Sequence, residues 1–150
     1  MAFFALLVTL WAVLWIISRF VFRQELASHA KKGRVAAALA FTFIGLSHLM
    51  TPGKMEYMIA GWLPYARELV IISGVAEIAG GIGLLIPRVQ RMAALGLIGL
   101  LVVMFPANIN VAINQLPPPG GLPAEPWYVW SRLLFQPLYM AWIWWSSLRK

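Results

Sequence analysis

Long runs of apolar residues alternate with short polar segments along this chain. A helix needs about 20 mostly apolar residues to cross the hydrocarbon core of a bilayer. Runs close to this length occupy residues 3–22, 35–50, 69–86, 92–113 and 127–145, and charged residues, proline or glycine bound them. Only short connecting segments separate these apolar runs, so the pattern predicts five transmembrane helices.

The composition supports the same interpretation. Of the 150 residues, 61% are hydrophobic and only 11% are charged, whereas soluble domains carry about 25% charged residues. The mean hydropathy is +0.78. A soluble globular protein is excluded, and the predicted fold class is all-α, a polytopic membrane helix bundle.

The basic residues predict an orientation, since cytoplasmic loops retain an excess of Lys and Arg. Nine of the twelve follow the first, third and fifth runs: Arg19, Arg23, Lys31, Lys32, Arg34, Arg88, Arg91, Arg149 and Lys150. Only Lys54 and Arg67 lie on the opposite side, and Arg132 is inside the fifth run. We therefore expect the amino terminus outside and the carboxyl terminus in the cytoplasm, as in a bacterial inner-membrane protein. The net charge of +7 then reflects topology and contact with membrane lipids, and no motif indicates a nucleic-acid partner.

The first apolar run is predicted to be a retained helix. The stretch before it contains no basic residue, and the run is longer than the core of a usual signal peptide. We divide the chain into an amino-terminal transmembrane helix with a basic cytoplasmic segment, residues 1–34, and a four-helix membrane bundle, residues 35–150.

Several polar side chains lie at membrane depth, where a charge costs about 2.5–3.5 kcal/mol on insertion scales. The group consists of His48, Glu77, Asn108, Asn110, Arg132 and Gln136. With the expected topology they occupy the centre or the outer half of the membrane, so they are predicted to meet in one polar pocket. The simplest pairing joins Glu77 to Arg132, because each charge would otherwise be stranded.

Two interpretations of this polar group stay open. We favour a structural ion pair between two helices; the alternative is a ligand or proton site that opens outward, and the additional amides add weight to it. His48 alone is typical of a histidine that bonds a carbonyl or a headgroup at a helix end. The chain contains no cysteine, no metal site is expected, and no catalytic motif identifies a self-sufficient enzyme.

Four motifs resemble the DoxX-like (DoxX/DoxD) membrane proteins. In order they are FTFIGLSHLMTP (residues 41–52), SGVAEIAGGIGLLIP (73–87), FPANINVAI (105–113) and SRLLFQPLYMAWIWW (131–145). The resemblance implies a four-helix core with one additional amino-terminal transmembrane helix. It also implies that Glu77, Asn108, Arg132 and Gln136 match membrane-embedded polar positions of that family, whereas a lysine is frequent where this chain has His48.

Members of that family are linked to thiosulfate:quinone oxidoreduction, to stress-related membrane complexes and to receptor assembly. Since those roles differ, we carry three hypotheses. The first is a quinone- or lipid-binding accessory subunit of a membrane redox assembly, with a quinone as the candidate cofactor and a redox protein as the partner. The second is a scaffold or assembly factor without enzymatic activity. The third, less favoured, is a small-solute transporter, which would need a homo-oligomer because five helices leave little room for a path.

Overall fold

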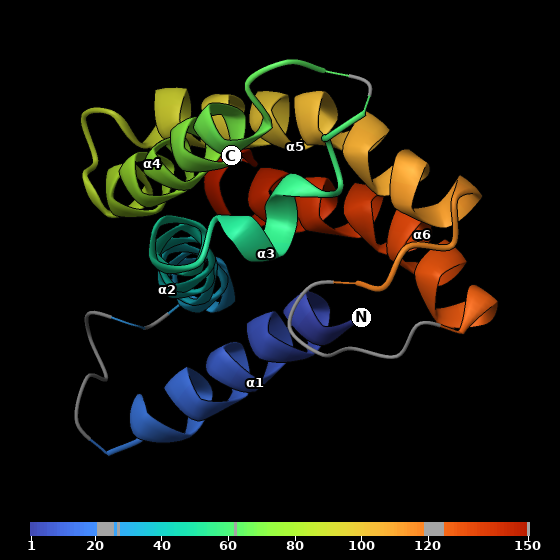
Figure 1. Ribbon diagram of the computed structural model, residues 1–150. Coiled ribbons are helices and arrows are strands. Elements are labelled where there is room, and N and C mark those ends of the chain that lie inside the picture. Colours follow the sequence, from blue (N-terminus) through green and yellow to red (C-terminus); the bar gives the residue numbers. More distant parts are fainter. Residues whose placement is uncertain (21–25, 27, 62, 119–124, 150) are drawn as a thin grey trace.

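A computed structural model of the chain describes residues 1–150 except 21–25, 27, 62, 119–124 and 150. The described residues form helices and connecting segments, with no strand among them. In order, the helices are α1 (Ala2–Ile17), α2 (His29–Met50), α3 (Gly53–Glu56), α4 (Ala66–Leu85), α5 (Gln90–Ile113), α6 (Pro126–Ile143) and a π-helical turn, η1 (Trp144–Leu148). Figure 1 shows α2 nearly end-on between α1 and α4, with α3 lying across the bundle. The predicted all-α class is confirmed.

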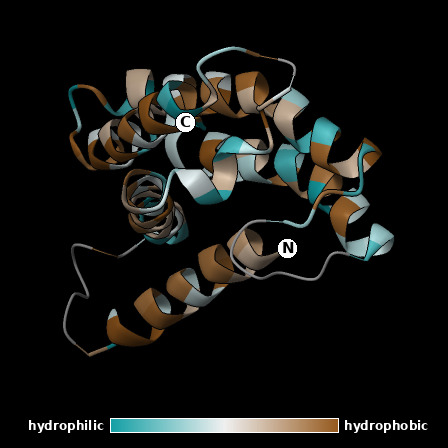
Figure 2. Ribbon diagram, in the orientation of Figure 1, coloured by the Kyte–Doolittle hydropathy of each residue, from teal (hydrophilic) through white to brown (hydrophobic). Residues whose placement is uncertain are grey.

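Three helices, α2, α4 and α5, are long and apolar enough to cross a membrane. α1 is apolar but shorter, and its ribbon is mostly brown in the hydropathy colouring of Figure 2. Large apolar side chains such as Ile72, Met92 and Leu134 are more than half exposed. A surface of this kind suits lipid and not water, so the chain is a helical membrane protein.

Helix boundaries differ from the apolar runs at several ends. α2 begins at His29, before residue 35, because the Ser28 hydroxyl accepts a hydrogen bond from the Lys31 amide (3.1 Å) and so caps a basic first turn. α1 ends at Ile17, short of residue 22, and residues 21 and 22 lie outside the described part. The fifth run is divided between α6 and η1. Apolar runs mark what the membrane covers, whereas caps decide where a helix begins and ends.

Glycines bring α2 and α4 into close contact. A Cβ atom added at Gly45 would lie 2.5 Å from the Gly74 carbonyl oxygen, and one at Gly74 would lie 2.7 Å from the His48 Cβ. A Cβ at Gly81 would lie 2.8 Å from the carbonyl oxygen of Ala38. Only hydrogen fits at these positions, which confirms that the small residues of α4 allow a neighbouring helix to approach.

The same device joins α4 to α5, but only near the turn between them. A Cβ at Gly80 would meet Leu97 at 2.6 Å, and one at Gly83 would meet Ala93 at 2.7 Å. Pro106 lies inside α5, and the helix changes direction toward its carboxyl end in Figure 1.

Hydrogen bonds between segments far apart in the sequence hold one end of the bundle together. At one end the Trp142 indole donates to the Gly33 carbonyl (2.9 Å), and the Gln90 amide donates to the Ser147 carbonyl (2.8 Å). The basic residues of the described part that lie on or beside these segments are Lys31, Lys32, Arg34, Arg88, Arg91 and Arg149. Arg23 and Lys150, which also entered the topology prediction, lie outside the described residues. The fold thus gathers one sign of charge at one end.

α1 packs on the bundle through its first turns. The Phe3 ring lies 5.1 Å from that of Phe41 and 4.8 Å from that of Tyr139, both edge-to-face. Leu7 is fully buried in a core that also contains Phe41, Leu97 and Ile143. Because Phe3 meets the middle of α2, the start of the chain lies inside the bundle, where it closes one side of a cavity.

Candidate functional site

A cavity of about 560 Å³ lies among α1, α2, α4, α5 and α6, and the α3 segment covers it. Pockets for small ligands typically measure about 300–1,000 Å³. Five of the six polar residues singled out in the sequence line this cavity: His48, Glu77, Asn108, Arg132 and Gln136. The predicted polar pocket is therefore present in the fold, with a different internal pairing.

The first polar wall joins α2 to α4. His48 Nδ1 lies 3.0 Å from Glu77 Oε2, and both side chains are at least nine-tenths buried. The predicted pairing of Glu77 with Arg132 is wrong: in the described structure the ion-pair partner of Glu77 is His48. The reason is local, since Gly45 and Gly74 bring α2 so close to α4 that the histidine reaches the carboxylate first.

A proton must lie between these two groups. An imidazole nitrogen and a carboxylate oxygen that both present lone pairs would repel each other at 3.0 Å. The distance between the two atoms is that of a hydrogen bond. The angle at the contact is unfavourable, so the buried Oε2 atom has no well-aligned donor. Ser73 Oγ lies 3.4 Å from the same histidine nitrogen and 2.8 Å from the Val70 carbonyl oxygen, to which it donates. The wall therefore holds one exchangeable proton and an incompletely bonded carboxyl group.

The second polar wall joins α5 to α6 through a chain of hydrogen bonds. Arg132 Nη2 donates to Asn108 Oδ1 (3.1 Å), and Asn108 Nδ2 donates to Gln136 Oε1 (3.0 Å). Gln136 Nε2 in turn donates to the Leu101 carbonyl oxygen (2.6 Å). Each amide is oriented by its neighbour, so the guanidinium is held from one side only. Its Nη1 atom is buried without a partner.

Asn110 does not belong to this pocket, contrary to the sequence prediction. Its amide donates to the Met58 carbonyl oxygen (2.8 Å), and its side-chain oxygen accepts from Asn114 (2.7 Å). On a helix, residues two positions apart point to different sides, so Asn108 and Asn110 cannot share a face of α5. Asn110 instead holds the segment after α3 against the end of α5.

A second contact fixes the cover of the cavity. The Tyr57 hydroxyl donates to the Pro117 carbonyl oxygen, which ties the segment after α3 to the segment after α5. Burial raises the pKa of this phenol, and the positive charge of Arg132 acts in the opposite direction. Lys54 of α3 and Met58, which follows this helix, also line the cavity. The polar walls are thus separated from the end of the bundle by a short, tethered cover.

The remaining lining is apolar and aromatic, and the sequence did not single it out. It includes Phe3, Phe41, Ile44, Leu100, Tyr128 and Tyr139. Sequence reasoning also missed Ser73, although its position four residues before Glu77 places both on one face of α4. The aromatic members carried no such signal, because only the packing of α1 against α2 and α6 brings them together.

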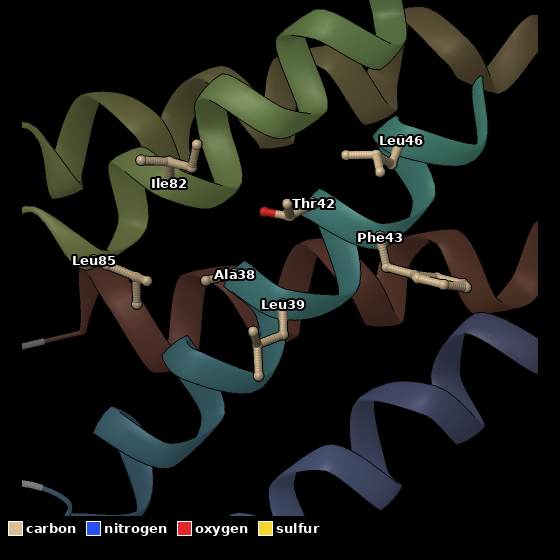
Figure 3. A pocket seen from close by; sticks show the side chains of 7 residues that line it. All are labelled: Ala38, Leu39, Thr42, Phe43, Leu46, Ile82 and Leu85. Carbon is tan, nitrogen blue, oxygen red and sulfur yellow. The ribbon is translucent and has the colours of Figure 1, made fainter. Parts of the chain in front are cut away.

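A shallower groove of about 390 Å³ lies between α2 and α4 on the outside of the bundle. Its lining is apolar apart from Thr42, as Figure 3 shows: Ala38, Leu39, Phe43, Leu46, Ile82 and Leu85. Thr42 is the one hydrogen-bonding side chain of this lining, which contains no acid and no base. It is suited to lipid chains, and the chemistry lies in the larger cavity.

Comparison with known proteins yields one match. A family model described as "Domain of unknown function (DUF8561)" matches residues 37–147, a range that contains both polar walls and leaves out α1. No curated protein and no solved structure matches the chain.

Proposed function

The chain belongs to the DUF8561 family, and we propose that it binds an amphiphile, a quinone or a lipid, as an accessory subunit of a membrane redox assembly. The cavity carries this proposal, because about 560 Å³ of space combines two polar walls with an aromatic and aliphatic lining. Such a lining accepts an apolar chain or ring, and a few convergent polar groups orient a head. Intramembrane ionisable residues are rare and typically functional.

The chemistry of the walls is compatible with a quinone. His48 and Glu77 lie 3.0 Å apart and both line the cavity, and an acid–base pair of this kind can exchange a proton with a ligand oxygen. Because the chain has no cysteine, any thiol or sulfur chemistry would reside in a partner or a bound cofactor. The resemblance to DoxX-like proteins supports the redox setting. In this proposal α2, α4, α5 and α6 form the DoxX-like core.

The same proposal includes the membrane arrangement. Five spans, with the amino terminus outside and the basic end of the bundle in the cytoplasm, agree with the positive-inside rule. The His48–Glu77 wall then faces the outer half of a bacterial inner membrane.

A substitution in the first polar wall tests the binding function. We expect mass spectrometry of the protein purified in a mild detergent to find a bound quinone or lipid, and Glu77→Gln to lose most of it. The change is nearly isosteric, so it removes the charge and the proton while the helix contact is kept. Glu68→Gln is the matched control, since Glu68 is exposed in the first turn of the same helix and should leave the ligand bound.

The alternative is a scaffold without a ligand, and the second polar wall favours it. A chain of bonds from Arg132 to the Leu101 carbonyl would stabilise the α5–α6 contact by itself. Recovery of a stable protein partner with no small molecule, unaffected by Glu77→Gln, would support this alternative against the binding function. A transporter has no comparable observation in its favour.

A further inference from the structure

Among the residues that the structure describes, no acidic side chain balances the charge of Arg132. Within the described residues the guanidinium forms no ion pair, its hydrogen bond goes to the neutral amide of Asn108 (3.1 Å), and Nη1 is buried without a partner. A buried cation without a counter-charge is costly, and more so in hydrocarbon than at a protein surface. A ligand in the cavity is therefore a natural source of the missing negative charge.

The four acidic residues that the structure describes are engaged or placed elsewhere. Glu77 faces His48 at 3.0 Å, and Glu56 faces Arg67 at 3.7 Å. Glu68 and Glu125 are exposed near the starts of α4 and α6, and Glu25 lies outside the described residues. The cavity also has Lys54 in its lining. Its walls thus carry more positive than negative charge.

The cavity opens sideways between α4 and α5. Leu69 and Ile72 of α4 and Val103 of α5 line it and are 38%, 63% and 75% exposed. A side chain that both lines a cavity and is exposed lies at its mouth. Gly80 and Gly83 give the closest approach of α4 to α5, near their connecting turn, whereas Ile72 and Val103 lie farther from that turn along their helices. The exposed residues at this mouth are apolar, as an opening toward lipid requires.

We propose that the ligand is an amphiphile with an anionic head, a carboxylate or a phosphate, that lies against Arg132 while its apolar chain leaves the cavity between α4 and α5. This inference rests on the proposed function and selects the lipid over the neutral quinone. Arginine binds both kinds of head through charge-assisted hydrogen bonds. Arg132 lines the cavity, and its guanidinium N–H groups that do not bond Asn108 supply the donors.

Native mass spectrometry of the delipidated wild-type protein tests the charge directly. Oleate should bind at least about tenfold more tightly than oleyl alcohol, which has the same chain and a neutral head. Dioleoyl phosphatidic acid distinguishes a phosphate from a carboxylate head, and tight binding of either anion supports the inference. Equal binding of oleate and oleyl alcohol, or tight binding of decylubiquinone with no binding of either anion, would overturn it while the binding function stands. Binding of none of these compounds would overturn both.

Variants locate the head and the chain. Arg132→Gln should abolish the preference for oleate, and Arg67→Gln, the same change at an exposed arginine, should keep it.

For the apolar chain of the ligand, Val103→Trp should slow association of a pyrene-labelled fatty acid by about tenfold or more, because the larger ring fills the mouth. Val102→Trp is the control, since Val102 is exposed but does not line the cavity. If a folded Arg132→Gln protein still prefers oleate, the head does not lie against Arg132. If the two tryptophan variants bind at equal rates, the apolar chain of the ligand does not leave between α4 and α5. The comparison of ligands on the wild type decides the charge even if Arg132→Gln does not fold.

Discussion

Individual polar residues in this bundle acquire their roles from the helix that faces them. His48 is at the end of an apolar helix and is unremarkable by its own position, yet it is the ion-pair partner of Glu77. Arg132, the obvious partner by charge, is held by Asn108. Opposite charges on two membrane helices do not pair unless those helices are in contact, and here α4, which carries Glu77, packs mainly against α2 and α5, whereas Arg132 is on α6.

A double-mutant cycle tests this pairing at the residue scale. His48→Leu and Glu77→Leu should each destabilise the protein, by up to about 3–5 kcal/mol, because each leaves one polar group buried and unpaired. The free energy of unfolding of the double variant should fall by about 1 kcal/mol less than the sum of the decreases in the two single variants. Unfolding midpoints in detergent give the comparison. A larger coupling in the matched cycle of Glu77 with Arg132 would contradict the assigned pair.

At the scale of the elements, helix–helix distance controls the site. The α2–α4 contact depends on glycines. A Cβ atom added at Gly45, Gly74 or Gly81 would lie less than 3 Å from an atom of the facing helix. The same contact sets the reach of His48 toward Glu77, since Gly74 lies directly against the histidine Cβ (2.7 Å). Packing and chemistry are therefore coupled through one pair of helices.

Adding a methyl group at this contact is expected to separate the helices. Gly74→Ala should destabilise the protein by about 1–3 kcal/mol, the cost of overpacking a close contact, and should weaken ligand retention. Gly96→Ala is the matched control, because no atom lies within 4 Å of the added Cβ and alanine favours a helix by about 0.5–1 kcal/mol. Thermal denaturation of both variants, followed by size-exclusion chromatography, gives the result. Equal midpoints would show that the glycine contact does not limit stability.

At the scale of the whole molecule, charge and apolar surface have separate places. The basic residues gather where the first turn of α2, the α4–α5 turn and η1 meet, and the segments after α3 and α5 cover the other end. Between these ends the outward-facing surface is largely apolar. This separation is expected of a bundle that crosses a bilayer with a fixed orientation.

The absence of cysteine makes the orientation straightforward to measure. In intact cells a membrane-impermeant maleimide should label Lys54→Cys on the outer side, whereas Arg88→Cys should react only after permeabilisation. The cysteine-free wild type is the blank. Labelling of Arg88→Cys alone in intact cells would reverse the proposed topology.

Composition and hydropathy were enough to predict the all-helical class, the membrane environment and five of the polar residues that line the cavity. These follow from composition and from the cost of placing charge in hydrocarbon, which depend on residue type and not on neighbours. Four features became visible only once the helices were packed together. They are the partner of Glu77, the separation of Asn110 from Asn108, the aromatic lining from α1 and the opening between α4 and α5. Each depends on which helices touch and how closely, and in this protein that depends on a few glycines whose effect is expressed only when two helices meet.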